Sequence, residues 1–244
     1  MVHYQPKVNL TTGEITGAEA LIRWTHPLRG LVPPSDSIPI AEDCGLIVPI
    51  GNWVLREACK QARTWMDAGL PLATMAVNIS AMEFRDEDFL DGVFRVLQDT
   101  GLDPGVLELE LTESVLMKRA ESTEAILMAL RARGIQLAVD DFGTGYSNLS
   151  YLRKFPIDAL KIGQSFIRQI TTAPDETTVV TAVISMGRSL KLRVVAEGVE
   201  TLEELTFLQA HHCDEAQGYY FSRPALAEDF AKLLTTGIPE AILS

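Results

Sequence analysis

The sequence predicts an α/β domain whose strands close into an eight-stranded barrel. Strand-like runs alternate with helical patterns along most of the 244 residues. The first two strand-like runs follow each other without a helix between them, and polar side chains recur where later runs end. Because strands and helices alternating in this number favour a closed barrel over an open sheet, we expect a TIM-like (β/α)8 barrel.

The first strand of this barrel is expected to run antiparallel to the others. Strand-like runs cover residues 3–10 and 15–24, and only Thr11-Thr12-Gly13-Glu14 lies between them. Four residues can form a hairpin turn, whereas a parallel crossover needs a dozen or more. The start of the first strand therefore lies at the same rim as the ends of the parallel strands.

The rest of the chain follows a strand–helix rhythm. Residues 31–34, Leu-Val-Pro-Pro, are expected to form a loop. The helix at 47–68 has Val54, Ala58, Ala62 and Trp65 on one face, and Gly69 ends it. The other helices are predicted at residues 88–100, 121–133, 147–154, 176–190 and 202–210, and the other strands at 72–79, 106–111, 135–139, 159–162, 192–196 and 215–217.

Composition indicates one soluble domain over residues 1–244. Hydrophobic residues make up 47% of the chain and charged residues 22%, as in ordinary globular proteins. No linker or internal repeat divides it. The three cysteines, Cys44, Cys59 and Cys213, lack metal-ligand spacing, which favours a reducing compartment and a cytoplasmic protein. No apolar stretch approaches ~20 residues, so direct membrane insertion is not expected.

The net charge of −12 excludes some partners. Such a surface repels a nucleic-acid backbone, so binding to DNA is not expected. A ligand that carries phosphate groups can still bind where cations reverse the local sign of the potential.

Polar side chains stand at the ends of successive strands. In the predicted barrel these ends share one rim, where active sites of such barrels lie. The reversed first strand brings Gln5 to the same rim. The strand-end residues are Glu19, Asn78, Glu110, Asp140, Asp141, Lys161 and Glu197.

These residue types predict a site for two hard cations. Two carboxylates ~4 Å apart repel by roughly 4 kcal/mol at an effective dielectric constant of ~20, so the cluster needs cations. Oxygen ligands without His or Cys suit Mg²⁺ or Mn²⁺. Asp140 can bridge two ions while Asp141 binds one, and a pair of ions stabilises an in-line phosphoryl displacement. Lys161 can hold or deprotonate the attacking water, with its pKa lowered by the adjacent cations.

Each feature taken singly has a simpler interpretation. A lone strand-end carboxylate usually caps a helix or binds loop N–H groups, and Lys161 alone would be a solvated or ion-paired lysine. The Gly143-Thr144-Gly145 turn can cradle a phosphate, but a simple loop fits it equally well. The joint pattern at one rim favours the cation site.

The chain resembles the EAL-domain phosphodiesterases, which linearise the bacterial second messenger cyclic di-GMP. The resemblance covers essentially the whole chain and includes the E-A-L signature itself. The matching segments are Tyr4-Gln5-Pro6, Glu19-Ala20-Leu21-Ile22-Arg23, Asn78-Ile79-Ser80, Glu110-Leu111-Thr112-Glu113, Asp140-Asp141-Phe142-Gly143-Thr144-Gly145, Lys161-Ile162, Ala196-Glu197-Gly198-Val199-Glu200 and Gln217-Gly218-Tyr219.

The resemblance implies a role for each of these residues. It implies metal-dependent hydrolysis of cyclic di-GMP to the linear dinucleotide pGpG, with Ca²⁺ inhibitory. Lys161 activates the water and Glu197 completes the network, while Glu113 anchors the loop after Asp141. The implied metal ligands are Glu19, Asn78, Glu110, Asp140 and Asp141, and the implied substrate contacts are Gln5, Arg23, Glu200 and Gln217. Members of the family are often homodimers, and many are fused to sensory domains.

One position departs from the family pattern. The family usually reads Lys-Ile-Asp, whereas Gly163 follows Lys161 and Ile162 here. Because the expected ligands and Lys161 are all present, an active phosphodiesterase is favoured over an inactive domain that only binds cyclic di-GMP. An enolase-like barrel also combines acids, Mg²⁺ and a lysine, but it does not need the Asp140-Asp141 pair. Such barrels also normally carry a separate capping domain, for which 244 residues leave no room.

Overall fold

The computed structural model describes residues 1–244 except 118–119, 144–151, 173–176, 240–241 and 243–244. The predicted helix at 147–154 falls largely on these positions, so residues 147–151 of that prediction lie outside the described part of the chain. Thr144 and Gly145 of the predicted turn lie outside it too.

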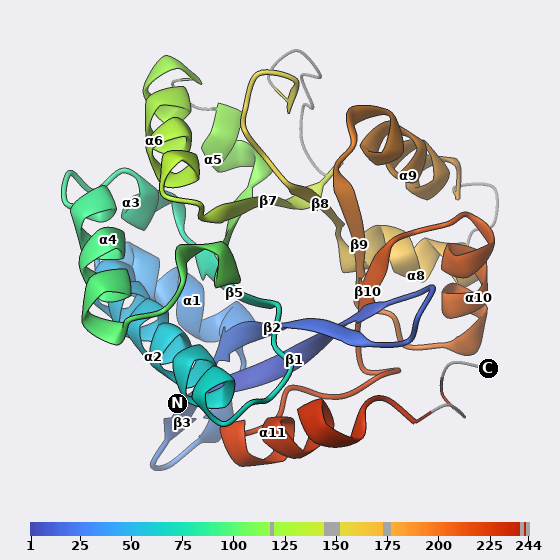
Figure 1. The fold of residues 1–244 in the computed structure, drawn as a ribbon, viewed down its shortest axis with the longest axis horizontal. Helices are drawn as coiled ribbons and strands as arrows, with labels where there is room; N and C mark the ends of the chain where they lie inside the picture. The colour runs from blue at the N-terminus through green and yellow to red at the C-terminus, as the bar shows by residue number, and fades with distance from the viewer. Residues whose placement is uncertain (118–119, 144–151, 173–176, 240–241, 243–244) are drawn as a thin grey trace.

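The described strands close into a barrel in the order β1-β10-β9-β8-β7-β6-β5-β2 (Figure 1). β1 pairs antiparallel with both of its neighbours, and all other neighbouring pairs are parallel. The predicted fold class is therefore confirmed, including the reversed first strand. The strands are β1 (Val2–Asn9), β2 (Ile15–Ile22), β5 (Thr74–Ile79), β6 (Leu107–Thr112), β7 (Gln136–Phe142), β8 (Ala159–Ile162), β9 (Arg193–Glu197) and β10 (Glu215–Gln217).

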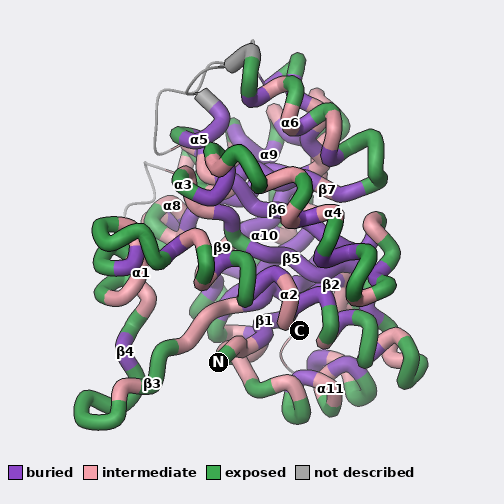
Figure 2. Tube along the Cα trace, turned by 90° about the vertical axis from the view of Figure 1, so that its left-hand side faces the viewer, coloured by how far each residue is buried: buried purple, intermediate pink, exposed green. Residues whose placement is uncertain are grey.

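Helices surround the barrel and supply the outer layer of the core (Figure 1). Five of them correspond to predicted helices: α2 (Ile47–Asp67), α4 (Phe89–Thr100), α6 (Ala120–Ala132), α9 (Thr178–Leu190) and α10 (Leu202–Ala210). The buried stretches follow the strands and the inner faces of the helices (Figure 2). α2 packs its apolar face inward, where Trp65 stacks on Phe230 at 5.0 Å and meets Tyr4 edge-on at 4.8 Å.

The prediction of a loop at residues 31–34 is wrong. Leu31 and Val32 belong to β4 (Gly30–Val32), which forms a small hairpin with β3 (Trp24–His26), and Pro34 opens α1 (Pro34–Asp43). Proline is compatible with the first turn of a helix because the N–H that it lacks would have no partner there. The pair of prolines therefore starts a helix.

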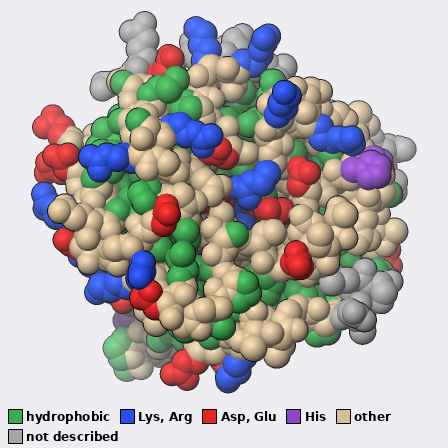
Figure 3. Space-filling model, viewed as in Figure 1, with side chains coloured by type: hydrophobic (Ala, Val, Ile, Leu, Met, Phe, Trp, Pro, Cys, Tyr) green, Lys and Arg blue, Asp and Glu red, His purple; other side chains and the backbone are tan. Residues whose placement is uncertain are grey.

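Further helices were not predicted from the sequence. They are α3 (Ala81–Phe84), η1 (Pro104–Val106), α5 (Glu113–Met117), α8 (Gln164–Thr172) and α11 (Ala227–Thr236). Of the helices that the structure describes, none has the length and apolar character to cross a membrane. Lys and Arg side chains are scattered among acidic and apolar ones on the face shown in Figure 3.

Candidate active site

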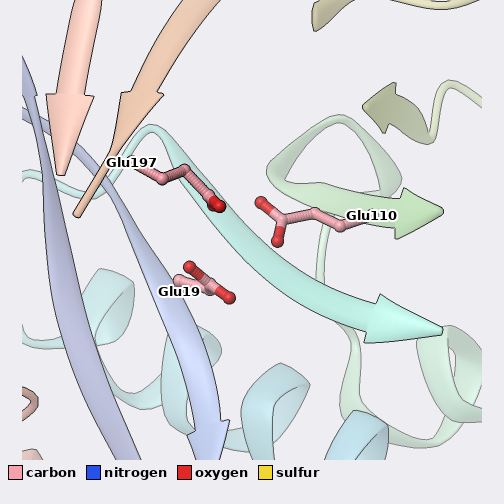
Figure 4. Close-up of side chains that lie close together, drawn as sticks. All are labelled: Glu19, Glu110 and Glu197. Carbon is pink, nitrogen blue, oxygen red and sulfur yellow. The ribbon is translucent and has the colours of Figure 1, made fainter. Parts of the chain in front are cut away.

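Carboxylates from several strands of the barrel converge at its carboxyl-terminal rim. Glu19 of β2, Glu110 of β6 and Glu197 of β9 point toward one another (Figure 4), and one oxygen from each lies within 4.8 Å of the others. Asp140 and Asp141, at the end of β7, form a second such group with Glu197. The structure thus brings the five predicted carboxylates into one cluster with Glu197 shared between its halves.

Lys161 lies among these carboxylates. Its Nζ atom donates to Glu110 Oε2 at 2.5 Å and forms a close ion pair with Glu197 Oε1. It lies 3.6 Å from Glu19 Oε2 and 3.5 Å from Asp140 Oδ1. Lys161 is fully buried on β8, and its ammonium lies within 4 Å of four carboxylates of the cluster.

Burial and mutual proximity shift the pKa values of this cluster. Burial lowers the pKa of Lys161, but Asp140, Glu110, Glu19 and Glu197 outweigh burial, so the pKa is well above its usual range. Burial raises the pKa of Glu197 well above its usual range, although Lys161 opposes the rise. Burial, reinforced by Glu19, also raises the pKa of Glu110. Burial therefore favours the protonated forms of Glu110 and Glu197, while the surrounding carboxylates favour the charged form of Lys161.

Amide side chains hold Glu19 in place. Gln217 of β10 donates through Nε2 to Glu19 Oε2 at 2.5 Å and to Gln5 Oε1 at 3.0 Å, and Gln5 donates to the carbonyl of Ser222 at 3.0 Å. Asn78 donates through Nδ2 to Glu19 Oε1 at 2.6 Å. The Oε1 atom of Gln217 is buried and has no hydrogen-bond partner among the described residues, so it is an acceptor available to a ligand.

The donor set fits hard divalent cations. Carboxylate oxygens dominate it, and neither His nor Cys belongs to the two acidic groups found in the described part of the chain. Rotation of the Asn78 amide would present its oxygen toward the same point, and the side chain is exposed at the mouth. These residues can hold Mg²⁺ or Mn²⁺.

A cavity of about 240 Å³ opens above the carboxylates. Gln5, Glu19, Asp140, Glu197 and Gln217 line it, so the carboxylate cluster and the cavity are continuous. The other lining residues are Leu21, Gln164, Gly198, Glu200, Gly218 and Tyr219.

Glu200 is held at the edge of this cavity. Its carboxylate accepts hydrogen bonds from Gln164 at 3.1 Å and from Arg168 at 3.3 Å. Across the mouth, the Arg223 guanidinium stacks over the Tyr219 ring at 4.3 Å. Gln164, Tyr219 and Arg223 were not predicted as site residues because they lie in the segments after the strands and not at the strand ends.

Two predicted site residues lie apart from the cluster. Arg23 donates to the carbonyl of its own neighbour Ile22 at 2.8 Å and lines a separate apolar groove of about 560 Å³ with Trp24 and Ile40. Burial lowers the pKa of Arg23. Glu113 is buried beside β7, where its Oε2 accepts from the Gly143 amide at 3.3 Å.

Gly163 leaves room that Asp141 occupies. A β-carbon added to Gly163 would lie 2.5 Å from Asp141 Oδ1. Asp141 itself has a left-handed backbone with φ of 51°. The carboxylate of Asp141 therefore lies over the glycine that stands where the family pattern has an aspartate.

A layer of buried charges below the rim was not predicted. Lys7 and Glu108 are both fully buried, and Arg193 joins them from the opposite end of the barrel. Strand alternation gives part of the signal, because Lys7 follows Gln5 by two residues and Glu108 precedes Glu110 by two, so each pair shares one face of its strand. That these faces line the interior follows only from closure of the barrel.

Fold and site together define an α/β barrel with an acidic, oxygen-rich pocket at the carboxyl ends of its strands. The EAL domain family model matches residues 1–224 of this chain. The chain belongs to the EAL-domain family, and Glu19-Ala20-Leu21 on β2 is its signature.

Curated relatives extend well beyond the part that this chain matches. The bifunctional diguanylate cyclase/cyclic di-GMP phosphodiesterase MucR of Pseudomonas aeruginosa is 45% identical over 228 residues, which are 93% of this chain and 33% of MucR. The cyclic di-GMP phosphodiesterase NbdA of the same species is 44% identical over 234 residues, or 95% of this chain and 30% of NbdA. The chain thus spans about a third of the length of these relatives.

A solved structure agrees closely with the fold. The structure described as PaMucR phosphodiesterase in complex with c-di-GMP has a TM-score of 0.92 and 44% identity, and the match covers 94% of this chain and 93% of that one.

Proposed function

We propose that this domain is a Mg²⁺- or Mn²⁺-dependent phosphodiesterase that hydrolyses cyclic di-GMP to linear pGpG. The observation that carries the proposal is the convergence of two carboxylate groups on Lys161 beneath one open cavity. The names of MucR and NbdA supply the substrate, because both relatives are called cyclic di-GMP phosphodiesterases.

Each site residue has a defined part in this reaction. Glu19, Asn78, Glu110, Asp140 and Asp141 would hold two cations, which when bound polarise the phosphodiester and favour ionisation of the attacking water. The water oxygen forms a bond to phosphorus, the bond to the 3′ oxygen breaks, and that oxygen takes a proton to become a hydroxyl group. Two 3′–5′ linkages close the cyclic substrate, so cutting one yields a single linear product.

Lys161 and Glu197 would control the attacking water. Their close ion pair lies among the carboxylates proposed to hold the cations, so both side chains could contact a water that binds there. The carboxylates keep the Lys161 ammonium protonated while no cation is bound, so its action as a base depends on the cations that the site would hold. Gln217 has a buried acceptor available to orient the water.

Substrate contacts would come from the cavity wall. Gln5, Gln217 and Glu200 line the cavity and can hydrogen-bond to the dinucleotide. For Arg23 to grip a phosphate through two donors, its guanidinium must leave the Ile22 carbonyl and turn toward the cavity. Glu113 would hold the backbone at Gly143 and so support Asp140 and Asp141 from behind.

Gly163 favours a second candidate, a domain that binds cyclic di-GMP and hydrolyses it weakly or not at all. The position lacks the carboxylate of the family pattern, and Asp141 lies over it. Since the other expected ligands and Lys161 converge, the phosphodiesterase remains the function that the geometry supports best.

Hydrolysis with chelator controls tests the proposal. The purified domain is incubated with cyclic di-GMP and Mn²⁺, with and without EDTA, and the products are separated by chromatography. We expect pGpG only with Mn²⁺, no turnover by Asp140→Ala, and none by Lys161→Ala, which should still bind cyclic di-GMP. Glu203→Ala, an exposed carboxylate on α10, is the matched control and should remain active. Binding of cyclic di-GMP without any pGpG at high enzyme concentration would leave only the receptor function.

Two further expectations belong to this proposal. Ca²⁺, which is larger and flexibly coordinated, should occupy the site and inhibit hydrolysis. A homodimer is also proposed, and light scattering of the purified domain measures it directly.

A further inference from the structure

The buried layer beneath the carboxylates forms a continuous chain of charges. Lys7 of β1 donates from Nζ to Glu108 Oε1 at 2.5 Å and to Glu110 Oε1 at 2.7 Å. Glu110 Oε2 accepts from Lys161 at 2.5 Å. One oxygen of Glu110 thus faces the catalytic cluster while the other is bound from below.

Lys7 is itself fixed from the opposite end of the barrel. Arg193, at the start of β9, forms a close ion pair with Glu108 Oε2 and a second one at 3.2 Å with Glu215 at the start of β10. Glu108 is fully buried, and Lys7 and Arg193 lower its pKa to about 2 despite burial, so it stays charged. The chain of contacts therefore runs from Glu215 through Arg193, Glu108 and Lys7 to Glu110.

Barrel interiors are usually filled by branched apolar side chains. Taking charges out of water is costly, and a buried ion pair is weak evidence for stability. A fully buried lysine that touches a proposed metal ligand is therefore better explained by what it does to that ligand.

We propose that Lys7 is a positioning residue of the metal site. Lys7 holds Glu110 Oε1 below the rim and so keeps Oε2 presented to the cavity side, with Glu108 and Arg193 keeping Lys7 in place. The inference rests on the proposed function, because Glu110 is there a metal ligand. Partners that orient metal ligands commonly change metal affinity by 10–100-fold when they are removed.

The test is Mn²⁺ binding by isothermal titration calorimetry, which needs no turnover. Removing Lys7 alone would take one of the two cationic partners from both Glu108 and Glu110 and add a net buried negative charge. The variant is therefore Lys7→Met/Glu108→Gln, which removes one charge of each sign. We expect its affinity for Mn²⁺ to fall by about ten-fold or more. Arg193→Met/Glu215→Gln is the comparison variant. It removes the ion pairs of Arg193 with Glu108 and Glu215 but keeps the contact between Lys7 and Glu110, so its affinity for Mn²⁺ should fall less than that of Lys7→Met/Glu108→Gln.

Other results of the titrations would contradict either the positioning role of Lys7 or the proposed function. Unchanged affinity in Lys7→Met/Glu108→Gln, or an equal loss in both double variants, overturns the positioning role. Wild-type protein that binds no Mn²⁺ overturns the proposed function instead. If circular dichroism shows that Lys7→Met/Glu108→Gln is unfolded, Lys7→Gln/Glu108→Gln replaces it, with the same loss expected and unchanged affinity again contradicting the proposal.

Discussion

At the scale of single residues, Gly163 leaves a space after β8 that the Asp141 carboxylate occupies. Gly163 is not among the described glycines with positive φ, so its backbone suits any residue. A β-carbon there meets only the far end of the Asp141 side chain at short range, and Asp141 can turn away. The glycine is therefore a matter of space for a carboxylate and not of backbone strain.

Gly163→Asp should leave the rate of pGpG formation equal or higher. The new carboxylate displaces the Asp141 side chain and supplies the acid that the family pattern has at this position. Gly163→Ala is the matched control, since it displaces Asp141 without supplying a carboxylate, and we expect it to slow turnover by roughly ten-fold. Steady-state kinetics with Mn²⁺ measures both. A severe loss in Gly163→Asp together with an active Gly163→Ala would contradict this account.

The sequence predicted which residues lie at the rim, but not which atoms they contact. Strand ends are recognisable because a hydrophobic run stops, so Glu110 and Lys161 stood out. Lys7 and Glu108 stand inside strands, where a charged residue ordinarily marks the solvent face. Only barrel closure shows that their side chains point inward. The hydrogen bond from the Arg23 guanidinium to the Ile22 carbonyl depends on local packing, which cannot be inferred from the sequence.

At the scale of elements, short helices depend on their caps. α3 has only four residues, too few for a periodic pattern, but its Ser80 and Glu83 form a complete capping box. Their spacing in the sequence is the signal by which this helix could have been predicted. Glu83 is also buried, with one oxygen packed against Gly51 of α2.

Glu83→Gln should stabilise the protein at pH 7.5. Burial, together with Glu42, raises the pKa of Glu83, so the folded state holds its proton more tightly than the unfolded state does. Stability therefore falls as pH rises through the ordinary carboxyl range toward the raised value. Glutamine keeps the cap and removes this cost. Urea unfolding at pH 7.5 and at pH 4 measures the difference, which should vanish at the lower pH.

A matched control separates the charge of Glu83 from its cap. Ser80→Ala removes the other half of the capping box and should lower the free energy of unfolding by about 1 kcal/mol at both pH values. A stabilisation by Glu83→Gln that persisted unchanged at pH 4 would mean that something other than ionisation causes it.

At the scale of the whole molecule, three features of the sequence were enough to predict the fold. Alternating elements predicted the barrel, the four-residue turn after β1 predicted its reversed strand, and the strand ends predicted the rim. The hairpin of β3 and β4 was missed, because its strands have only three residues each. The charged interior was missed because it is a property of the closed barrel and not of any one strand.

Closure of the barrel brings the carboxylates close together, where they repel one another. Bound cations would offset this repulsion, so the free energy of unfolding should depend on metal binding. In the absence of cations Lys161 is the ammonium that contacts Glu19, Glu110, Asp140 and Glu197. Lys161→Met would remove this partner from all four carboxylates and leave Glu110 with Lys7 alone. Removing one partner of a buried ion pair costs about 3–5 kcal/mol of folding free energy. Bound Mn²⁺ should supply the missing positive charge, so the deficit relative to wild type should shrink when Mn²⁺ is present.

Urea unfolding of wild type and Lys161→Met, in EDTA and in saturating Mn²⁺, measures this linkage. Lys232→Met serves as the control, because Lys232 pairs with Asp229 at an exposed position of α11, and it should behave as wild type in both conditions. A deficit of equal size in EDTA and in Mn²⁺ would show that cations do not take over the role of Lys161. A smaller deficit in Mn²⁺ would show that the ammonium and the metal ions balance the same carboxylates, which makes the acidic rim unstable by itself and stable once its cations are bound.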